Sequence, residues 1–172
     1  MDKRWILILI VIIMAVVCGY FIVSSSNTVG NAIVDVNKFT VTVPPGFGIE
    51  SSTADTTTLI KKGGVEKVSI KDLGKKDIAL SEYNKKLKSL SKNGDIEIIS
   101  NTTDSRDNLT IDTIKYQDYS KENLTNQSIT YLYTYERTFS VKLTSFSDVN
   151  YMDDVLTFIA DTLKPDYKKS QE

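Results

Sequence analysis

The sequence contains no histidine and only one cysteine among its 172 residues. Histidine is the commonest general base near neutral pH and the commonest zinc ligand, so its absence excludes most catalytic triads and most zinc sites. The one cysteine, Cys18, cannot form an intramolecular disulfide, and it lies inside an apolar run, which leaves no thiol elsewhere for a nucleophile or a metal cluster. The sequence therefore predicts a domain stabilised by packing, with no metal, no cofactor and no enzymatic activity.

Short motifs of known chemistry are incomplete. Ser89 and Lys92 have the spacing of the S-x-x-K motif, but no K-T-G follows, and the serine falls in an ordinary amphipathic helix. Asp104, Asp107 and Asp112 lack the alternation of an EF-hand, and such residues are favoured in solvated turns. The 21 Lys and Arg residues and the 22 Asp and Glu residues are interspersed, which gives no electrostatic footprint for nucleic acid.

The chain does contain a long apolar run, residues 5–23, without a charged side chain. At about 1.5 Å rise per residue, a helix of this length spans about 28 Å, close to the hydrocarbon core of a bilayer. Lys3 and Arg4 precede the run and no basic residue follows it until Lys38, so the positive-inside rule places the N-terminus in the cytoplasm. We expect a single-pass anchor in the cell membrane with the rest of the chain outside.

Three other fates of this run are open, and the first is a buried helix of a soluble protein. A signal peptide cleaved near residues 24–26 would share the basic start, but its apolar region is shorter, and no A-x-A site follows Val23. Cys18 also resembles the lipidated cysteine of a bacterial lipoprotein. That pattern requires a small residue immediately before the cysteine, whereas Val17 precedes Cys18. An uncleaved anchor is the favoured interpretation.

The rest of the chain is long enough for one domain to bury a core without disulfides. We expect four segments: a cytoplasmic tip with the transmembrane anchor over 1–23, a flexible tether over 24–30, a single domain over 31–168, and a tail over 169–172. The tether is predicted because its sequence, SSSNTVG, is small, polar and aperiodic.

Alternation of apolar and polar residues predicts the strands of this domain. They are expected at residues 32–36, 38–43, 56–62, 65–72, 95–103, 108–119, 127–136 and 138–146. Gly63 and Gly64 are expected to form a two-residue hairpin turn, because glycine tolerates the positive φ that such turns require. The last four strands, joined by polar turns, are expected to pair as a meander.

Spacings of three and four residues predict two helices. The first covers residues 78–92, and its apolar face is expected to consist of Leu80, Tyr83, Leu87 and Leu90. The second covers 149–163, with Asp148 as its N-cap and Pro165 as its stop. The fold class is therefore α+β: an N-terminal transmembrane helix followed by a mainly antiparallel sheet, of about six strands or more, with helices packed on it.

This order of elements resembles the PsbP/Mog1-like family. Residues 39–47, FTVTVPPGF, are similar to the family's opening strand and its proline-glycine-aromatic turn, and residues 129–146 and 151–165 resemble its closing hairpin and helix. The resemblance implies roles as photosystem II extrinsic subunits, as binding proteins of a nuclear-transport GTPase, or as envelope proteins of unknown role; the anchor points to the last group. Metal binding in some plant members involves histidine, which this chain lacks.

A series of tyrosines is the best candidate for a binding surface, because aromatic rings with a polar tip are enriched at interfaces. Alternate strand positions also point into a core, and the period of the series favours packing. The candidates are Tyr116, Tyr119, Tyr131, Tyr133 and Tyr135.

Four N-x-S/T sequons agree with an external domain that carries glycans, although a chain rich in Asn and Thr produces such triplets by chance. They are centred on Asn101, Asn108, Asn123 and Asn126.

These observations favour a membrane-anchored, extracytoplasmic, non-enzymatic domain that binds a protein, an envelope component or a small ligand. Two alternatives are open: an unrecognised hydrolase that uses neither His nor Cys, and a structural accessory subunit of a membrane complex. Nucleic acid is not expected as a partner.

Overall fold

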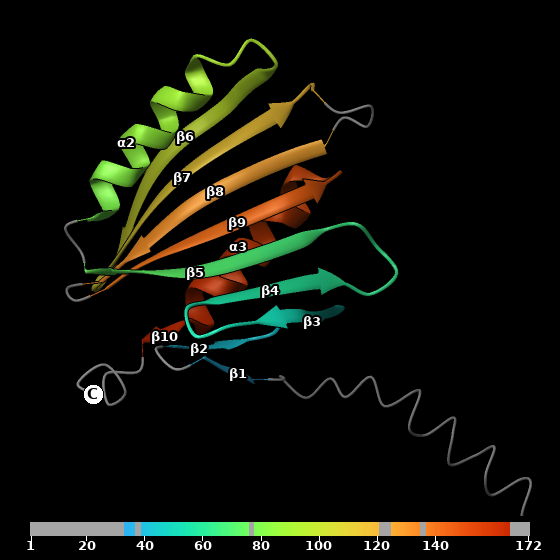
Figure 1. Cartoon of the computed structure of the whole chain (residues 1–172), viewed down its shortest axis with the longest axis vertical. Helices are drawn as coiled ribbons and strands as arrows, with labels where there is room; N and C mark the ends of the chain where they lie inside the picture. Colours follow the sequence, from blue (N-terminus) through green and yellow to red (C-terminus); the bar gives the residue numbers. More distant parts are fainter. Residues whose placement is uncertain (1–32, 37–38, 76–77, 121–124, 135–136, 166–172) are drawn as a thin grey trace, which may run out of the picture. The chain divides into compact units, whose positions relative to one another are not determined.

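The computed structural model describes residues 33–36, 39–75, 78–120, 125–134 and 137–165 (Figure 1). These residues belong to one compact unit, Ala32–Glu172. The predicted anchor, tether and tail lie outside the described residues, as do Asn123 and Tyr135. No helix within the described ranges is long and apolar enough to cross a bilayer.

The described residues of this unit form ten strands and two helices. The strands are β1 (Ile33–Val36), β2 (Phe39–Thr42), β3 (Phe47–Ser52), β4 (Thr56–Lys61), β5 (Lys67–Lys75), β6 (Ile96–Arg106), β7 (Leu109–Asp118), β8 (Thr125–Tyr133), β9 (Arg137–Phe146) and β10 (Lys164–Pro165). The helices are α2 (Ile78–Ser91) and α3 (Val149–Thr162). Asp148 caps α3 as predicted, because its side chain accepts hydrogen bonds from the amides of Asn150 and Tyr151.

The main sheet has seven antiparallel strands in the order β3-β4-β5-β9-β8-β7-β6. The predicted meander from β6 to β9 is confirmed. Strand β5 pairs with β9 and so joins β3 and β4 to the meander. Strand β3 was not expected, because five of its six residues are only partly buried or exposed and its register shifts between Ile49 and Ser51. Such a strand lacks the alternation of apolar and polar residues by which strands are predicted from a sequence. A second sheet has the order β1-β2-β10.

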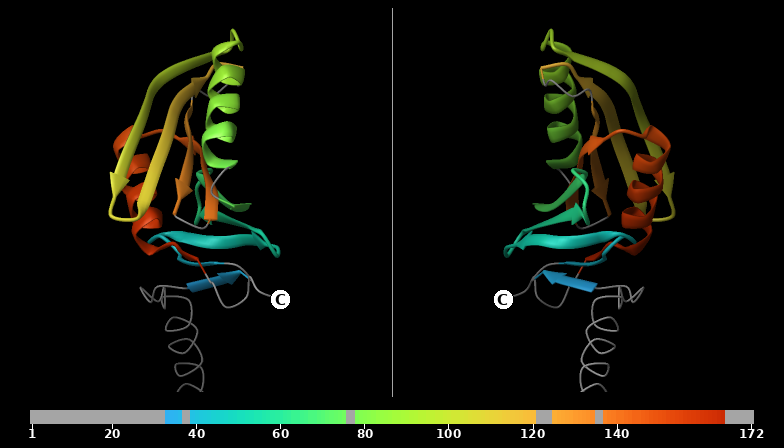
Figure 2. Two further views of the ribbon diagram at one scale, coloured as in Figure 1. Left: turned by 90° about the vertical axis from the view of Figure 1, so that its left-hand side faces the viewer. Right: turned by 90° about the vertical axis from the view of Figure 1, so that its right-hand side faces the viewer.

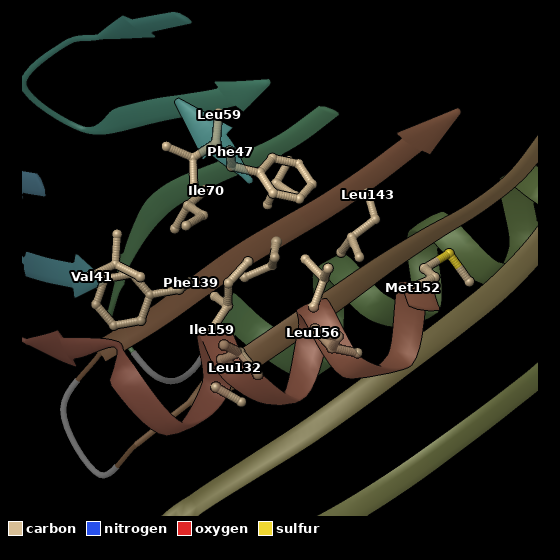
Figure 3. Packing of buried hydrophobic residues seen from close by; sticks show 14 of the residues in the cluster. Val41, Phe47, Leu59, Ile70, Leu132, Phe139, Leu143, Met152, Leu156 and Ile159 are labelled. Atoms are coloured by element: carbon tan, nitrogen blue, oxygen red, sulfur yellow. The ribbon is translucent and has the colours of Figure 1, made fainter. Parts of the chain in front are cut away.

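One face of the main sheet carries the larger core, together with α3 and residues of β2 (Figure 3). Phe39 of β2 and Phe139 of β9 meet edge to face, with ring centroids 5.3 Å apart. Met152, Leu156 and Ile159 come from one stripe of α3, as the spacing predicts. The main sheet is therefore buried on this side by a helix and a second sheet.

The opposite face carries a smaller core under α2 (Figure 2). Leu90, Tyr83 and Leu87 pack on Tyr116 and Tyr131 of the sheet, together with Ile114, Ile129, Leu73, Ile96 and Ile98. The expectation that Leu80 belongs to this face was wrong, since Leu80 is 61% exposed and Ala79 is buried instead. Ala79 lies four residues before Tyr83 and so takes the place of Leu80 in the first turn of the stripe, whose other members Tyr83, Leu87 and Leu90 are as predicted.

The hairpin between β4 and β5 is confirmed, but its turn is longer than predicted. The amide of Lys61 donates to the carbonyl of Glu66, which leaves a four-residue loop around Gly63 and Gly64. Within it the amide of Gly64 donates to the carbonyl of Lys61, and Gly63 has a φ of 71°. This is the position in a type II turn that requires positive φ, so one glycine, not two, has the unusual conformation.

Candidate functional site

A groove of about 120 Å³ lies between α3 and the strands β6 and β7. Its wall on the sheet carries Arg106, Thr113 and Lys115, and its wall on the helix carries Asp153, Leu156 and Ala160. Charged side chains of both signs therefore border a small, partly apolar floor.

Strand alternation and helical spacing bring these residues together. Positions 102, 104 and 106 of β6 lie on one face of the sheet, next to positions 111, 113 and 115 of β7, because side chains two apart share a face. Positions 153, 156, 157 and 160 of α3 share one side of the helix, because they are spaced by three and four. The groove lies where the row of strand residues faces the row of helix residues.

Lys115 and Asp153 form the inner charge pair of the groove. The Nζ atom of Lys115 lies 2.5 Å from Oδ1 and 2.6 Å from Oδ2 of Asp153. The lysine side chain is only 18% exposed, because its aliphatic stem extends from the face of the sheet to α3. This pair therefore fixes the distance between β7 and the helix.

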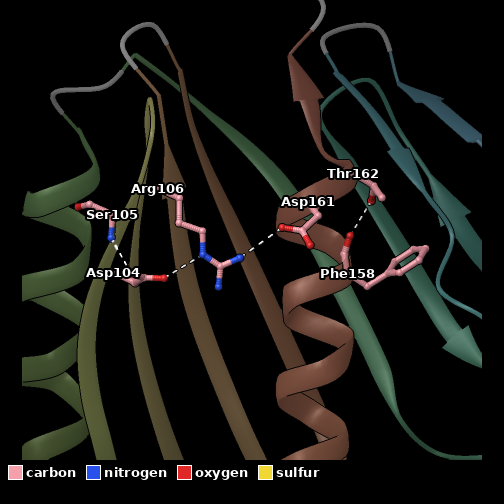
Figure 4. Close-up of polar contacts among 6 residues, drawn as sticks. All are labelled: Asp104, Ser105, Arg106, Phe158, Asp161 and Thr162. Carbon is pink, nitrogen blue, oxygen red and sulfur yellow. Dashed lines mark hydrogen bonds and ion pairs between the residues drawn. The ribbon is translucent and has the colours of Figure 1, made fainter.

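Arg106 forms the outer charge pair, and it contacts two carboxylates (Figure 4). Its Nε atom lies 3.0 Å from Oδ2 of Asp104, and its Nη1 atom lies 3.3 Å from Oδ1 of Asp161 on α3. All three side chains are about half exposed, so solvent weakens both contacts to roughly 0–1 kcal/mol. Arg106 can therefore exchange one of these carboxylates for a ligand at little cost.

Buried hydroxyl groups on β8 lie beside the groove residues of β7, but they do not line the groove itself. The hydroxyls of Thr113 and Thr130 lie 3.2 Å apart and share a hydrogen bond. Ser128, which is opposite Lys115 in the register of β7 and β8, has a buried hydroxyl without a hydrogen-bond partner. The groove itself places the apolar Ile111 and Leu156 between its charged groups, which suits a ligand that combines a short apolar part with charges at its ends.

The arrangement offers binding chemistry more than reaction chemistry. In the described part of the chain, no three His, Cys, Asp or Glu residues are grouped closely enough to hold a metal ion. Asp104 and Asp112 do not converge, because Asp104 pairs with Arg106 whereas Asp112 accepts a 2.6 Å hydrogen bond from Thr103 on the other face of the sheet. The expectation that Asp112 is a solvated turn residue was wrong, since it lies in β7 and is 3% exposed.

The predicted tyrosines do not form one surface. Tyr116 and Tyr131 are buried under α2, where the Tyr131 ring meets Tyr83 edge to face at 6.4 Å. Burial raises the pKa of Tyr131 to about 12 and also raises the pKa of Tyr116. Their role is therefore packing, which is the alternative that the period of the series favoured.

The remaining tyrosines differ from these two in their surroundings. Tyr133 is half buried, and burial together with the charge of Asp112 raises its pKa. Tyr119 is 51% exposed, and its hydroxyl donates a 2.6 Å hydrogen bond to Glu97, which raises its pKa. Tyr119 is thus the one exposed member of the series among those that the structure describes.

Three of the four sequons fall within the described ranges. Asn101 is exposed on β6, and Asn108 is exposed in the turn between β6 and β7. Asn126 is half buried, and its Nδ2 atom donates a 3.2 Å hydrogen bond to the carbonyl of Ser147. Asn108 therefore has the most accessible amide, since it lies at the tip of a hairpin.

Sequence reasoning did not find the groove residues. The sequence alone assigns no role to Asp153, Arg106 or Lys115. One signal was present: Lys115 interrupts a strand that is otherwise buried, between Ile114 and Tyr116. A charge at such a position requires a partner from another element, but the sequence does not say which one.

Several solved structures share this fold, whereas no family model and no curated protein matches the chain. The solution structure of cyanobacterial PsbP (CyanoP) from Synechocystis sp. superposes with a TM-score of 0.54 at 12% identity, covering 76% of this chain and 88% of that chain. The crystal structure of the Ran-binding protein Mog1p from Saccharomyces cerevisiae superposes with a TM-score of 0.50 at 10% identity, covering 73% and 89%. The chain has the PsbP/Mog1-like fold, as its sequence predicts.

Proposed function

We propose that this chain is a single-pass, membrane-anchored domain that works outside the cytoplasm and binds a ligand without chemical conversion. The proposal of ligand binding rests on the groove between α3 and β6–β7. The groove has one charge pair inside it and a weakly held arginine, Arg106, at its mouth. The proposal of a membrane anchor rests on the uncharged apolar run of residues 5–23.

The groove suits a segment of a protein, an envelope component or a small ligand that bears charges of both signs. Arg106 would accept an anionic group, and the carboxylates of Asp104 and Asp161 would accept a cationic one. A volume of about 120 Å³ admits one side chain or a small polar molecule. Protein binding is also stated in the name of Mog1p, which has the same fold.

The first test concerns the location of the domain. Cys18 is the only cysteine, so a Cys18→Ser chain with Ser81→Cys carries a single thiol on the exposed side of α2. In intact cells, a membrane-impermeant maleimide is expected to label this thiol fully, and permeabilising the cells is expected to add no label. Labelling that appears only after permeabilisation would place the domain on the cytoplasmic side.

The second test concerns the groove. A photo-cross-linking residue in place of the exposed Thr157 is expected to form a discrete adduct in cells that express the full chain, whereas the same residue in place of Leu80 on the opposite face is not. Adding Arg106→Gln is expected to reduce the Thr157 adduct several-fold, because the cation at the mouth is lost. An adduct with a membrane protein complex would favour the accessory-subunit alternative.

Equal adducts at positions 157 and 80, or an adduct unaffected by Arg106→Gln, would contradict a binding role for the groove. The hydrolase alternative predicts a different result, namely a product that is released and not a retained partner. Ser89, the serine of the S-x-x-K match, is exposed on α2, on the face of the sheet opposite the groove.

A further inference from the structure

Folding separates charges that are interspersed in the sequence. Helix α2 carries Lys85, Lys86 and Lys88 with Glu82 as its one acidic residue, and Lys92 follows its end. Helix α3 carries Asp153, Asp154 and Asp161 and no basic residue. The basic helix α2 and the acidic helix α3 cover opposite faces of the main sheet (Figure 2).

Three lysines of the basic face form a line, which we call the lysine stripe: Lys85, Lys88 and Lys92. Their spacing of three and four residues places them on one side of α2, opposite the buried Tyr83, Leu87 and Leu90. All three are exposed, and the side chain of Lys85 is 79% exposed. At 1.5 Å rise per residue the stripe is about 10 Å long.

Glu82, the one acidic residue of α2, lies 3.8 Å from Lys85, at the limit of an ion pair, and such a surface contact is worth about 0–1 kcal/mol. This contact is therefore too weak to neutralise Lys85. The neighbouring strand β5 adds the exposed Lys71, whose position lies on the same face of the sheet as α2.

We propose that the lysine stripe is a docking surface for a linear inorganic polyphosphate. Charge complementarity calls for an anion, and the length of the stripe calls for a repeating one, because a single small anion cannot contact lysines spread over about 10 Å. The inference is independent of the groove, which lies on the other face of the sheet.

Two other anionic occupants fit the stripe less well. A lipid surface would favour apolar residues among the lysines, but the exposed apolar residues of α2, Ile78 and Leu80, lie in its first turn. The acidic face of a second copy offers fewer usable charges, because Asp153 and Asp161 are already paired with Lys115 and Arg106. A polymer requires neither apolar contacts nor a matching protein surface.

The test uses the full chain in nonionic detergent and fluorescently labelled, long-chain inorganic polyphosphate, followed by anisotropy. The variant Lys85→Gln with Lys88→Gln keeps good helix formers at both positions. We expect its Kd to rise roughly 30-fold, and the slope of log K against log salt to become shallower by about 1.4, since each lost lysine contact removes about 0.7. The matched control is Lys62→Gln with Lys164→Gln, which removes the same charge from exposed positions outside α2 and the neighbouring strands. It is expected to bind within about twofold of the native chain.

Equal weakening by both double variants would overturn the proposal, because it would show an effect of net charge alone. So would equally tight binding of orthophosphate, as judged by competition, since the site would then recognise one phosphate and not a polymer. Binding to vesicles with anionic lipid but not to polyphosphate would assign the stripe to a membrane. Self-association that the stripe variant abolishes, without polyphosphate binding, would assign it to a second copy.

Discussion

Replacing Phe139 by alanine is expected to lower the free energy of unfolding by about 4 kcal/mol, because deleting a buried aromatic ring loses its transfer free energy and leaves a cavity. Phe139 is fully buried in β9, and its ring meets Phe39 of the second sheet edge to face. The loss is therefore expected to loosen the contact between the two sheets as well as the core under α3. Chemical denaturation of the full chain in nonionic detergent, followed by circular dichroism, measures it.

The matched control is Leu80→Ala on α2. Leu80 has the hydrophobic character of a core residue but is 61% exposed, so the change is expected to stay within about 0.5 kcal/mol. A cost above about 2 kcal/mol for Leu80→Ala would show that α2 is rotated so that Leu80 packs on the sheet. A cost below about 1 kcal/mol for Phe139→Ala would contradict the burial of this ring.

The sequence predicts the fold because its strong patterns are local. The stripe of Met152, Leu156 and Ile159 and the cap at Asp148 each depend on residues within one helix, and both are confirmed. The meander from β6 to β9 follows from short polar turns, since neighbouring strands with such turns pair with each other. These features need no knowledge of distant contacts.

The features that failed depend on tertiary contacts. Strand β3 gains its place from pairing with β4, while its own residues are mostly exposed. Ala79 displaces Leu80 from the apolar face because the sheet surface lies close to the first turn of α2. The register of the turn at Gly63 is set by the pairing of Lys61 with Glu66, whose side chains also form a 2.8 Å ion pair.

The candidate site shows the same division. Tyr131 and Tyr116 follow a strand period that the sequence displays, and they are buried as that period indicates. The groove, by contrast, joins Lys115 to Asp153 across 38 residues and Arg106 to Asp161 across 55. The charge separation between α2 and α3 is equally invisible in a sequence with interspersed signs, because it arises only when the two helices take opposite faces of the sheet.

A buried ion pair between β5 and β9 gives the second large expected effect. Arg137 pairs with Asp72 through its Nη2 atom, and the two side chains are 17% and 1% exposed. Asp72 also accepts a 2.8 Å hydrogen bond from the amide of Gly74, and the Nε atom of Arg137 is buried without a partner. The carboxylate therefore depends on one guanidinium contact and one amide for its compensation.

Arg137→Met is expected to cost about 3 kcal/mol, because it leaves the Asp72 carboxylate buried without its counter-charge. The double variant Asp72→Asn with Arg137→Met is expected to be more stable than Arg137→Met by about 1–2 kcal/mol, since the asparagine oxygen still accepts from Gly74 and no buried charge is left. Urea denaturation of the native chain, both single variants and the double variant measures the coupling. If the double variant is no more stable than Arg137→Met, the cost arises from the lost packing of the planar guanidinium and not from the unpaired charge. In that case Arg137→Lys, which keeps the charge but not the planar fork, should be as destabilising as Arg137→Met.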